Sequence, residues 1–126
     1  MKKVVISGSS KLKEELMTWK NHFEQEGYVV IDYPKQIKKE NLKDAYKNFY
    51  KSLEQTDILF LMNEERKNIK GYIGPSSMAE LIYAVMLNQI HNKNIEIYIL
   101  NMPSKELNGY EEIKLFLENG WIKMYK

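Results

Sequence analysis

The stretch GYIGPSSMAE, residues 71–80, continues into LIYAVMLNQI, residues 81–90, and predicts a glycine-containing loop that leads into a helix. Pro75 suits the first turn of a helix, where its missing N–H costs nothing. Ser76 or Ser77 can accept hydrogen bonds from the free backbone N–H groups of that turn. We therefore expect the helix to begin at about residue 75.

Between residues 78 and 90 this helix is apolar on nearly every side, so we expect it to be buried. Glu80 is its one charged residue, and a buried carboxylate is costly unless it is paired, hydrogen-bonded or directed into a cavity. The helix N-terminus favours negative charge, which is expected to keep Glu80 ionised. Such a carboxylate can attack an anomeric carbon or stabilise an oxocarbenium ion. In the structural alternative, Glu80 bonds free backbone N–H groups or pairs with a lysine.

Short apolar runs alternate with amphipathic segments along the rest of the chain. Strands are expected at residues 4–6, 28–32, 58–62, 95–100 and 121–125. Helices are expected around residues 12–23, 42–53, 75–90 and 110–118, with Gly27 closing the first. This alternation predicts a parallel sheet with helices on both faces. We predict one α/β domain over residues 1–126. It is doubly wound and flavodoxin-like or Rossmann-like, with a mostly parallel five-stranded sheet in the order 2-1-3-4-5.

Two amphipathic helices precede the third strand, and each carries its aromatic residues in an apolar stripe. Trp19 and Phe23 belong to the first stripe, and Tyr46 and Phe49 belong to the second. Side chains at these spacings share one helix face. We expect all four to belong to the core.

Ligands of doubly wound sheets bind beyond the carboxyl ends of the strands, where the winding reverses. In the predicted order this point lies between the first and third strands, so the loops at residues 7–10 and 63–77 should meet there. The second loop delivers Glu80. The first, Ser-Gly-Ser-Ser, can cradle an anion with backbone N–H groups or can be an ordinary turn. It matches neither the Walker loop nor the dinucleotide fingerprint.

The composition excludes several classes of function. The chain has 126 residues and a net charge of +2, which gives no reason to expect a nucleic acid polymer or a membrane as partner. The lysine-rich stretch between Lys35 and Lys43 is expected to be a solvated face. Without cysteine, thiolate chemistry and cysteine-type zinc sites are absent, and we expect no metal and no cofactor. We expect a cytoplasmic location.

Several segments together resemble the nucleoside 2-deoxyribosyltransferase superfamily, in particular its small bacterial and archaeal branch. They are KVVISGS at residues 3–9, TDILFLMN at 56–63, YIG at 72–74 with Glu80 six residues later, and IYILN at 97–101. Each motif alone is loose, whereas their order and spacing are fairly specific. The similarity covers nearly the whole chain.

The resemblance implies cleavage of the N-glycosidic bond of deoxynucleosides or nucleoside monophosphates. In the family a glutamate on the third helix is the nucleophile and carries the sugar as an ester, and Glu80 in AELIYA, residues 79–84, matches it. Transferases pass the sugar to another base, and hydrolases pass it to water. The hydrolases hold a 5′-phosphate with serines and backbone groups, which implies Ser9, Ser76 and Ser77 as counterparts.

The sequence departs from the family at three positions. A tyrosine that orients the nucleophile from the first strand corresponds to about Val5 here. An aspartate six residues before the glutamate corresponds to Gly74, and another family aspartate falls near Asn48 or Phe49. Other residues or a neighbouring subunit then fill these roles, or the chemistry is altered or lost.

We predict Glu80 as the catalytic residue. The residues predicted to bind substrate are Gly8, Ser9, Asn63, Tyr72, Gly74, Ser76 and Ser77, with Asn63 and Tyr72 as ligand-facing loop residues. The expected partner is a small-molecule nucleoside or nucleotide, and the resemblance implies a homo-oligomer.

Three alternatives remain open at this point. The segment GPSSMAE, residues 74–80, faintly resembles the PGGxGTxxE loop of nucleoside-monophosphate phosphoribohydrolases, although glycines are missing. The absent tyrosine and aspartate favour a non-catalytic module that senses a nucleotide. In the third alternative the fold has lost its function, and Glu80 only caps the helix.

Overall fold

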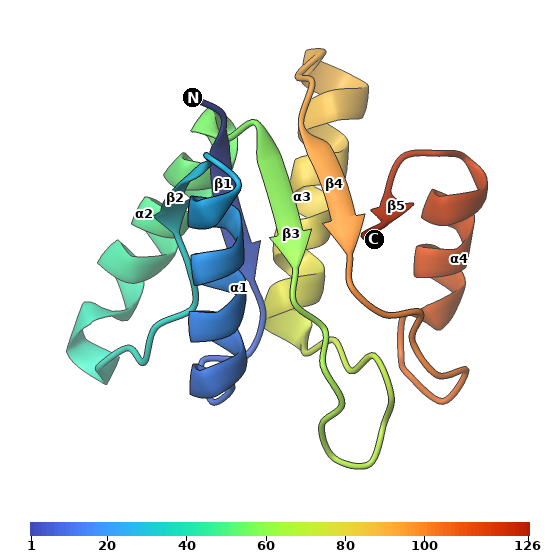
Figure 1. Cartoon of the computed structure of the whole chain (residues 1–126). Coiled ribbons are helices and arrows are strands. Elements are labelled where there is room, and N and C mark those ends of the chain that lie inside the picture. Colours follow the sequence, from blue (N-terminus) through green and yellow to red (C-terminus); the bar gives the residue numbers. More distant parts are fainter.

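The computed structural model describes residues 1–126 and contains a five-stranded, all-parallel sheet flanked by four helices (Figure 1). The strands are β1 (Lys3–Ser7), β2 (Val29–Asp32), β3 (Ile58–Leu61), β4 (Glu96–Ile99) and β5 (Lys123–Met124). The helices are α1 (Lys13–Gln25), α2 (Leu42–Gln55), α3 (Pro75–His91) and α4 (Tyr110–Glu118), and a 3-10 turn, η1 (Lys39–Asn41), precedes α2. The strand order β2-β1-β3-β4-β5 confirms the predicted α/β fold and its topology.

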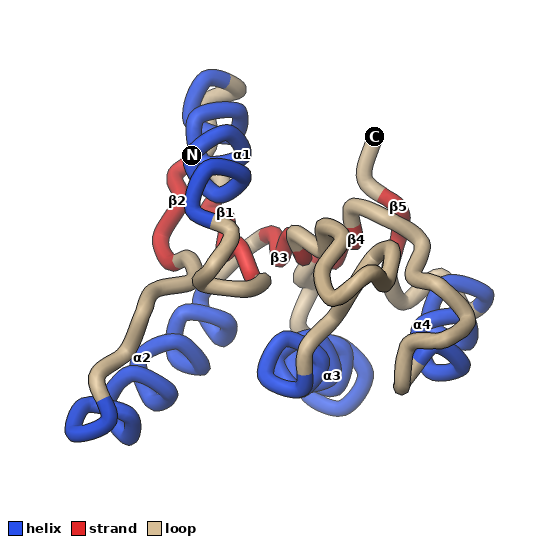
Figure 2. Tube along the Cα trace, turned by 90° about the horizontal axis from the view of Figure 1, so that it is seen from below, coloured by secondary structure: helices blue, strands red, loops and turns tan.

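The helices divide unequally between the two faces of the sheet. Figure 2 shows α1 on one face and α2, α3 and α4 on the other. Right-handed crossovers explain this division, because the chain moves one way from β1 to β2 and the opposite way through β3, β4 and β5. The reversal leaves a crevice beyond the carboxyl ends of β1 and β3.

Alternation of side chains along the strands divides the core into two clusters. On the face of α2, α3 and α4, strand residues such as Val5 and Leu59 pack with Leu53, Leu81 and other buried side chains. On the α1 face, a smaller cluster is built from the neighbouring strand positions and Phe23. Both faces of the central strands are therefore buried, which agrees with the continuous apolar runs in their sequences.

The stripe of α2 is less buried than the sequence predicts. Leu53 is fully buried and Phe49 is half-buried, but Leu42 and Tyr46 are 44% and 41% exposed. Figure 1 shows the first turns of α2 lying beyond the sheet, where no strand covers them. The expectation that Tyr46 belongs to the core is therefore wrong, and its ring borders the site instead.

The expectation that α3 is buried on nearly every side is also wrong. Leu81, Val85 and Leu87 are buried, whereas Ala79 is exposed and Ile90 is 63% exposed. The helix packs on the sheet and beside α2, and these contacts cover only part of its circumference. None of the helices combines the length and the apolar character that crossing a bilayer requires.

Candidate functional site

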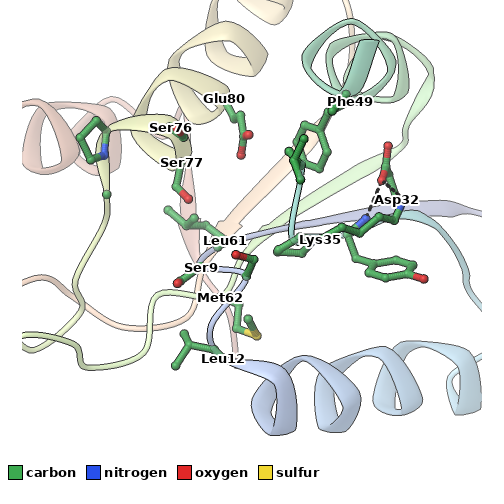
Figure 3. Close-up of a pocket in the computed structure, with 18 of the residues that line it drawn as sticks. Ser9, Leu12, Asp32, Lys35, Phe49, Leu61, Met62, Ser76, Ser77 and Glu80 are labelled. Carbon is green, nitrogen blue, oxygen red and sulfur yellow. Dashed lines mark hydrogen bonds and ion pairs between the residues drawn. The ribbon is translucent and has the colours of Figure 1, made fainter. Parts of the chain in front are cut away.

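A cleft of about 520 Å³ opens where the winding of the sheet reverses (Figure 3). Its walls come from the loops after β1, β2 and β3, the first half of α2, the end of β3 and the first turns of α3. A volume of this size fits a small organic ligand. The cleft therefore lies at the position that the topology predicts.

Glu80 extends from α3 into this cleft and meets a hydroxyl from β1. Ser7, the last residue of β1, is 1% exposed, and its Oγ donates a hydrogen bond of 2.5 Å to Oε1 of Glu80. Ser7 is two positions after Val5, so both side chains leave the strand on the same face. Ser7 thus brings a hydroxyl to the Glu80 carboxylate from the last position of the first strand.

Burial raises the pKa of Glu80 from 4.5 to about 7, because the charged form loses solvation. The hydrogen bond from Ser7 opposes this shift and lowers the pKa, while the negative charge of Asp32 raises it. The helix N-terminus was expected to keep Glu80 ionised, whereas a pKa of about 7 leaves it only partly ionised near neutral pH. Glu80 lies in the second turn of α3, and the effect of the free N–H groups fades within the first turn.

Replacing Ser7 with alanine is expected to raise the pKa of Glu80 further, by about one unit or more. The carboxylate would lose its hydroxyl donor while its burial stays the same. Carbon-detected NMR of the glutamate carboxyl groups across pH 4 to 10 measures this shift without any substrate. Ser10→Ala provides the control, because Ser10 borders the cleft but has no hydrogen bond to Glu80. An unchanged Glu80 titration in Ser7→Ala would refute the assigned role of Ser7.

Most residues that the sequence predicts for substrate binding do line the cleft. These are Gly8, Ser9, Tyr72, Gly74, Ser76 and Ser77. Gly8 has φ +153°, and an added Cβ would lie 3.1 Å from the carbonyl oxygen of Met62, so the loop after β1 can approach β3 closely only with glycine. Gly74 is extended, and its added Cβ would come no closer than 3.7 Å to the Tyr72 ring, so nothing there requires glycine.

Asn63 lies elsewhere, and the expectation that its side chain faces a ligand is wrong. The residue is 1% exposed and does not line the cleft. Its Nδ2 donates to the carbonyl oxygens of Gly71 and Asn101, and its Oδ1 accepts from the N–H groups of Leu100 and Asn101. The side chain therefore joins the end of β3 to the loops before α3 and after β4. It supports the site without touching the cleft.

Sequence reasoning missed Arg66 as a site residue. It stands in a short hairpin closed by Lys67 and Asn68, both at positive φ, within the loop after β3. Its Nη1 donates to Oγ of Ser9 at 3.1 Å, and its guanidinium lies 5.7 Å from the centre of the Tyr72 ring. Arg66 lines the cleft and forms no ion pair, so its charge is available to a ligand.

Asp32 and Lys35 are charged cleft residues that sequence reasoning also missed, and they come from the end of β2 and the loop after it. Oδ1 of Asp32 accepts from the Tyr33 N–H at 2.9 Å and from Nζ of Lys35 at 3.1 Å, and Oδ2 accepts from Oγ of Ser52 at 2.8 Å. The Asp32 side chain is only 10% exposed. Asp32 could have been predicted, because it is the last residue of the strand that pairs with β1. Lys35 was not predicted, because the lysine-rich stretch was interpreted as a solvated face.

No three His, Cys, Asp or Glu side chains gather in an arrangement that would hold a metal ion. Compared with models of known protein families and with curated protein sequences, the chain matches none.

Proposed function

We propose that this protein cleaves or transfers the N-glycosidic bond of a nucleoside or nucleoside 5′-monophosphate, with Glu80 as nucleophile. The observation that carries this proposal is the Ser7–Glu80 pair, a buried hydroxyl that orients a carboxylate into a cleft of ligand size. Glu80 is on the third helix, as the nucleophile is in the resembling deoxyribosyltransferases. A cleft at the topological switch point adds independent support.

In the proposed reaction the ionised Glu80 attacks C1′ of the sugar while the bond from C1′ to the base nitrogen breaks. The base leaves with the electron pair of that bond and takes up a proton from solvent, and the sugar remains as an ester of Glu80. Water or a second base then attacks C1′ and releases the carboxylate. With a pKa of about 7, Glu80 reaches its nucleophilic form as the pH rises through neutrality.

The unpaired charge of Arg66 favours a substrate that carries a phosphate. A guanidinium binds phosphate oxygens through charge-assisted hydrogen bonds, and Ser9 beside it offers a hydroxyl. Arg66 approaches from the loop after β3, whereas Ser76 and Ser77 border the same cleft from the start of α3. We therefore place monophosphates ahead of nucleosides as substrates.

Replacing Arg66 with glutamine is expected to lower kcat/KM for a monophosphate by about 10- to 100-fold and to change it little for the matching nucleoside. The matched control is Lys70→Gln, which removes a positive charge from an exposed position in the same loop outside the cleft. Equal losses for nucleotide and nucleoside would contradict a phosphate-binding role.

The experiment that tests the function is a chromatographic screen of deoxy- and ribonucleosides and their monophosphates, with and without a second free base. Released base indicates a hydrolase, and a new nucleoside indicates a transferase. Preference for ribose 5′-monophosphates would favour the phosphoribohydrolase alternative. Tight nucleotide binding without turnover would favour a sensor and overturn the enzymatic proposal.

We also propose that the protein forms a homo-oligomer through the exposed side of α3. Ala79, Tyr83, Met86 and Ile90 follow at spacings of four, three and four, so they form one stripe on the helix. Ala79 and Ile90 are exposed, whereas Tyr83 and Met86 pack in part against the core, so the chain covers the stripe only in part. The stripe begins beside Glu80, which brings a second copy close to the cleft.

Ile90→Glu is expected to shift the protein towards monomers in sedimentation velocity, because it introduces a charge into this stripe. Gln89→Glu adds the same charge at the adjacent exposed position, which lies outside the stripe, and is the control. A monomeric wild-type protein at micromolar concentration would contradict the proposed assembly.

A further inference from the structure

The cleft has a second polar end, which the chemistry at Glu80 does not use. In Figure 3, Phe49 projects between Glu80 on one side and Asp32 with Lys35 on the other. All four residues line the same cleft, and the charge of Asp32 is close enough to affect Glu80. A ligand whose reacting atom lies at Glu80 therefore extends past an aromatic ring towards Asp32.

Asp32 accepts several hydrogen bonds and can accept one more. Three donors point at its two oxygens, which is the pattern of an accepting carboxylate. Oδ1 accepts two of these hydrogen bonds, whereas Oδ2 accepts only the one from Ser52. Each carboxylate oxygen has two acceptor positions, so Oδ2 can take one further donor. The residue lines the cleft although its side chain is 10% exposed, so a ligand in the cleft is placed to supply that donor.

Beside this acceptor the cleft is apolar and suits a flat ring. Phe49 is half-buried and lines the cleft, and Leu61, which is 1% exposed, lines it as well. An aromatic side chain can stack on any nucleobase, because every base has a flat π face. On the outer side, Lys35 binds Asp32 with one of its three N–H donors and keeps two for other acceptors.

We propose that Asp32 determines which base the cleft accepts and selects bases that carry an exocyclic amino group. This proposal rests on the proposed function, because it assigns the base of that substrate. The base stacks on Phe49, its amino group donates to Oδ2 of Asp32, and Lys35 donates to a ring acceptor. An exocyclic amino group projects beyond the ring. In bases that carry an oxygen in its place, the carboxylate meets a carbonyl oxygen that it repels, and the adjacent ring N–H lies beside that oxygen.

A purely structural role for Asp32 makes a different prediction. In that case Asp32 only ties the end of β2 to Ser52 on α2, and its replacement weakens all ligands equally. Asp32→Asn separates the two roles. The amide oxygen can take the place of Oδ1 and accept from Tyr33 and Lys35, while the NH2 takes the place of Oδ2. There it can donate to Oγ of Ser52, whose hydroxyl also reaches the carbonyl oxygen of Asn48, and it presents an N–H donor that suits a carbonyl on the base.

The experiment measures binding of dCMP against dUMP and of dAMP against dIMP by titration calorimetry. Each pair shares sugar and phosphate and differs by an amino group in place of an oxygen. The titrations use the wild-type protein and also Glu80→Gln, in which cleavage cannot consume the ligand. Both proteins are expected to bind the amino-bearing member of each pair about tenfold or more tightly. Asp32→Asn is expected to remove or reverse this preference. Ser52→Ala keeps the carboxylate and should keep the preference, and Asp44→Asn is the control for an exposed aspartate outside the cleft.

Equal affinities within both pairs, or a preference that Asp32→Asn leaves unchanged, would overturn the proposal. Turnover without base preference would refute the role of Asp32 and leave the proposed function standing. A preference that Asp32→Asn reverses, in a protein without turnover, would refute only the glycosidic chemistry. Failure of every nucleotide to bind would overturn both.

Discussion

Glu80→Gln is expected to reduce glycosidic turnover by about 10³-fold or more while the fold is retained, because an amide cannot act as the carboxylate nucleophile. Glutamine has nearly the same shape, and its side-chain oxygen can still accept the hydrogen bond from Ser7. The loss therefore isolates the charge and nucleophilicity of Glu80 from its packing. Single-turnover measurements on the substrate found in the screen would quantify it.

The same substitution is expected to change how stability depends on pH. The pKa of Glu80 is raised in the folded state, so both states hold the proton below pH 4.5. Between pH 4.5 and about 7 the unfolded chain releases that proton while the folded chain keeps it, so this contribution to stability falls as pH rises. The loss is on the order of 3 kcal/mol by pH 8. The Glu80→Gln variant has no ionisable group at this position and does not undergo this loss, so it should be more stable than the wild type at pH 8.

Urea unfolding at pH 4, 6 and 8 measures this difference without any substrate, so it holds whether or not the protein is an enzyme. Glu65→Gln, at an exposed position in the loop after β3, is the matched control and should follow the wild-type pH dependence. Turnover that survives in Glu80→Gln would remove Glu80 as the nucleophile. A wild-type stability that does not fall between pH 4.5 and 8 would contradict the raised pKa.

Asn63→Ala is expected to lower the free energy of unfolding by about 2–4 kcal/mol. The substitution removes the side-chain partner of two loop carbonyl groups and of two partly buried N–H groups, of which the Leu100 N–H keeps its hydrogen bond to the Leu61 carbonyl oxygen. All four belong to the backbone of loops around the cleft, so the damage should concentrate there. Amide hydrogen exchange should speed up at Leu100 and Asn101 more than within α1.

Asn101→Ala is the matched comparison, because the Asn101 side chain is exposed and its amide makes one hydrogen bond, to the carbonyl oxygen of Asn63. Its expected cost is about 1 kcal/mol. Similar losses in the two variants would show that Asn63 does not hold the loops together in the way its four side-chain hydrogen bonds indicate.

The fold could be predicted because its signals are local and repeated. Short apolar runs and amphipathic stripes alternate along the chain, and the handedness of crossovers then restricts the topology to very few choices. Glu80 was identifiable for the same reason, as one charge in an apolar helix. Gly8, Ser9 and the residues at the start of α3 followed from the position of the switch point.

The direction of a side chain in a loop could not be predicted in the same way. Asn63 and Arg66 lie three residues apart in one polar loop, yet the structure turns Asn63 inward to backbone groups of the loop after β4 and turns Arg66 towards Ser9. Those partners are distant in the sequence, so no local pattern distinguishes the two roles. The extent of desolvation at Glu80 likewise depends on β1 and α2, which its own helix does not reveal.

The position of β1 between β2 and β3 also determines when this chain can fold. β1 pairs with β2 through Val4 and Val30, and with β3 through Val4 and Ile58, so one flank of the first strand stays open until the third is synthesised. Non-local parallel pairing of this kind slows folding, and a nascent chain that stops short of β3 exposes an unpaired apolar edge. On the ribosome, the amino-terminal half therefore carries this unpaired edge until β3 has emerged.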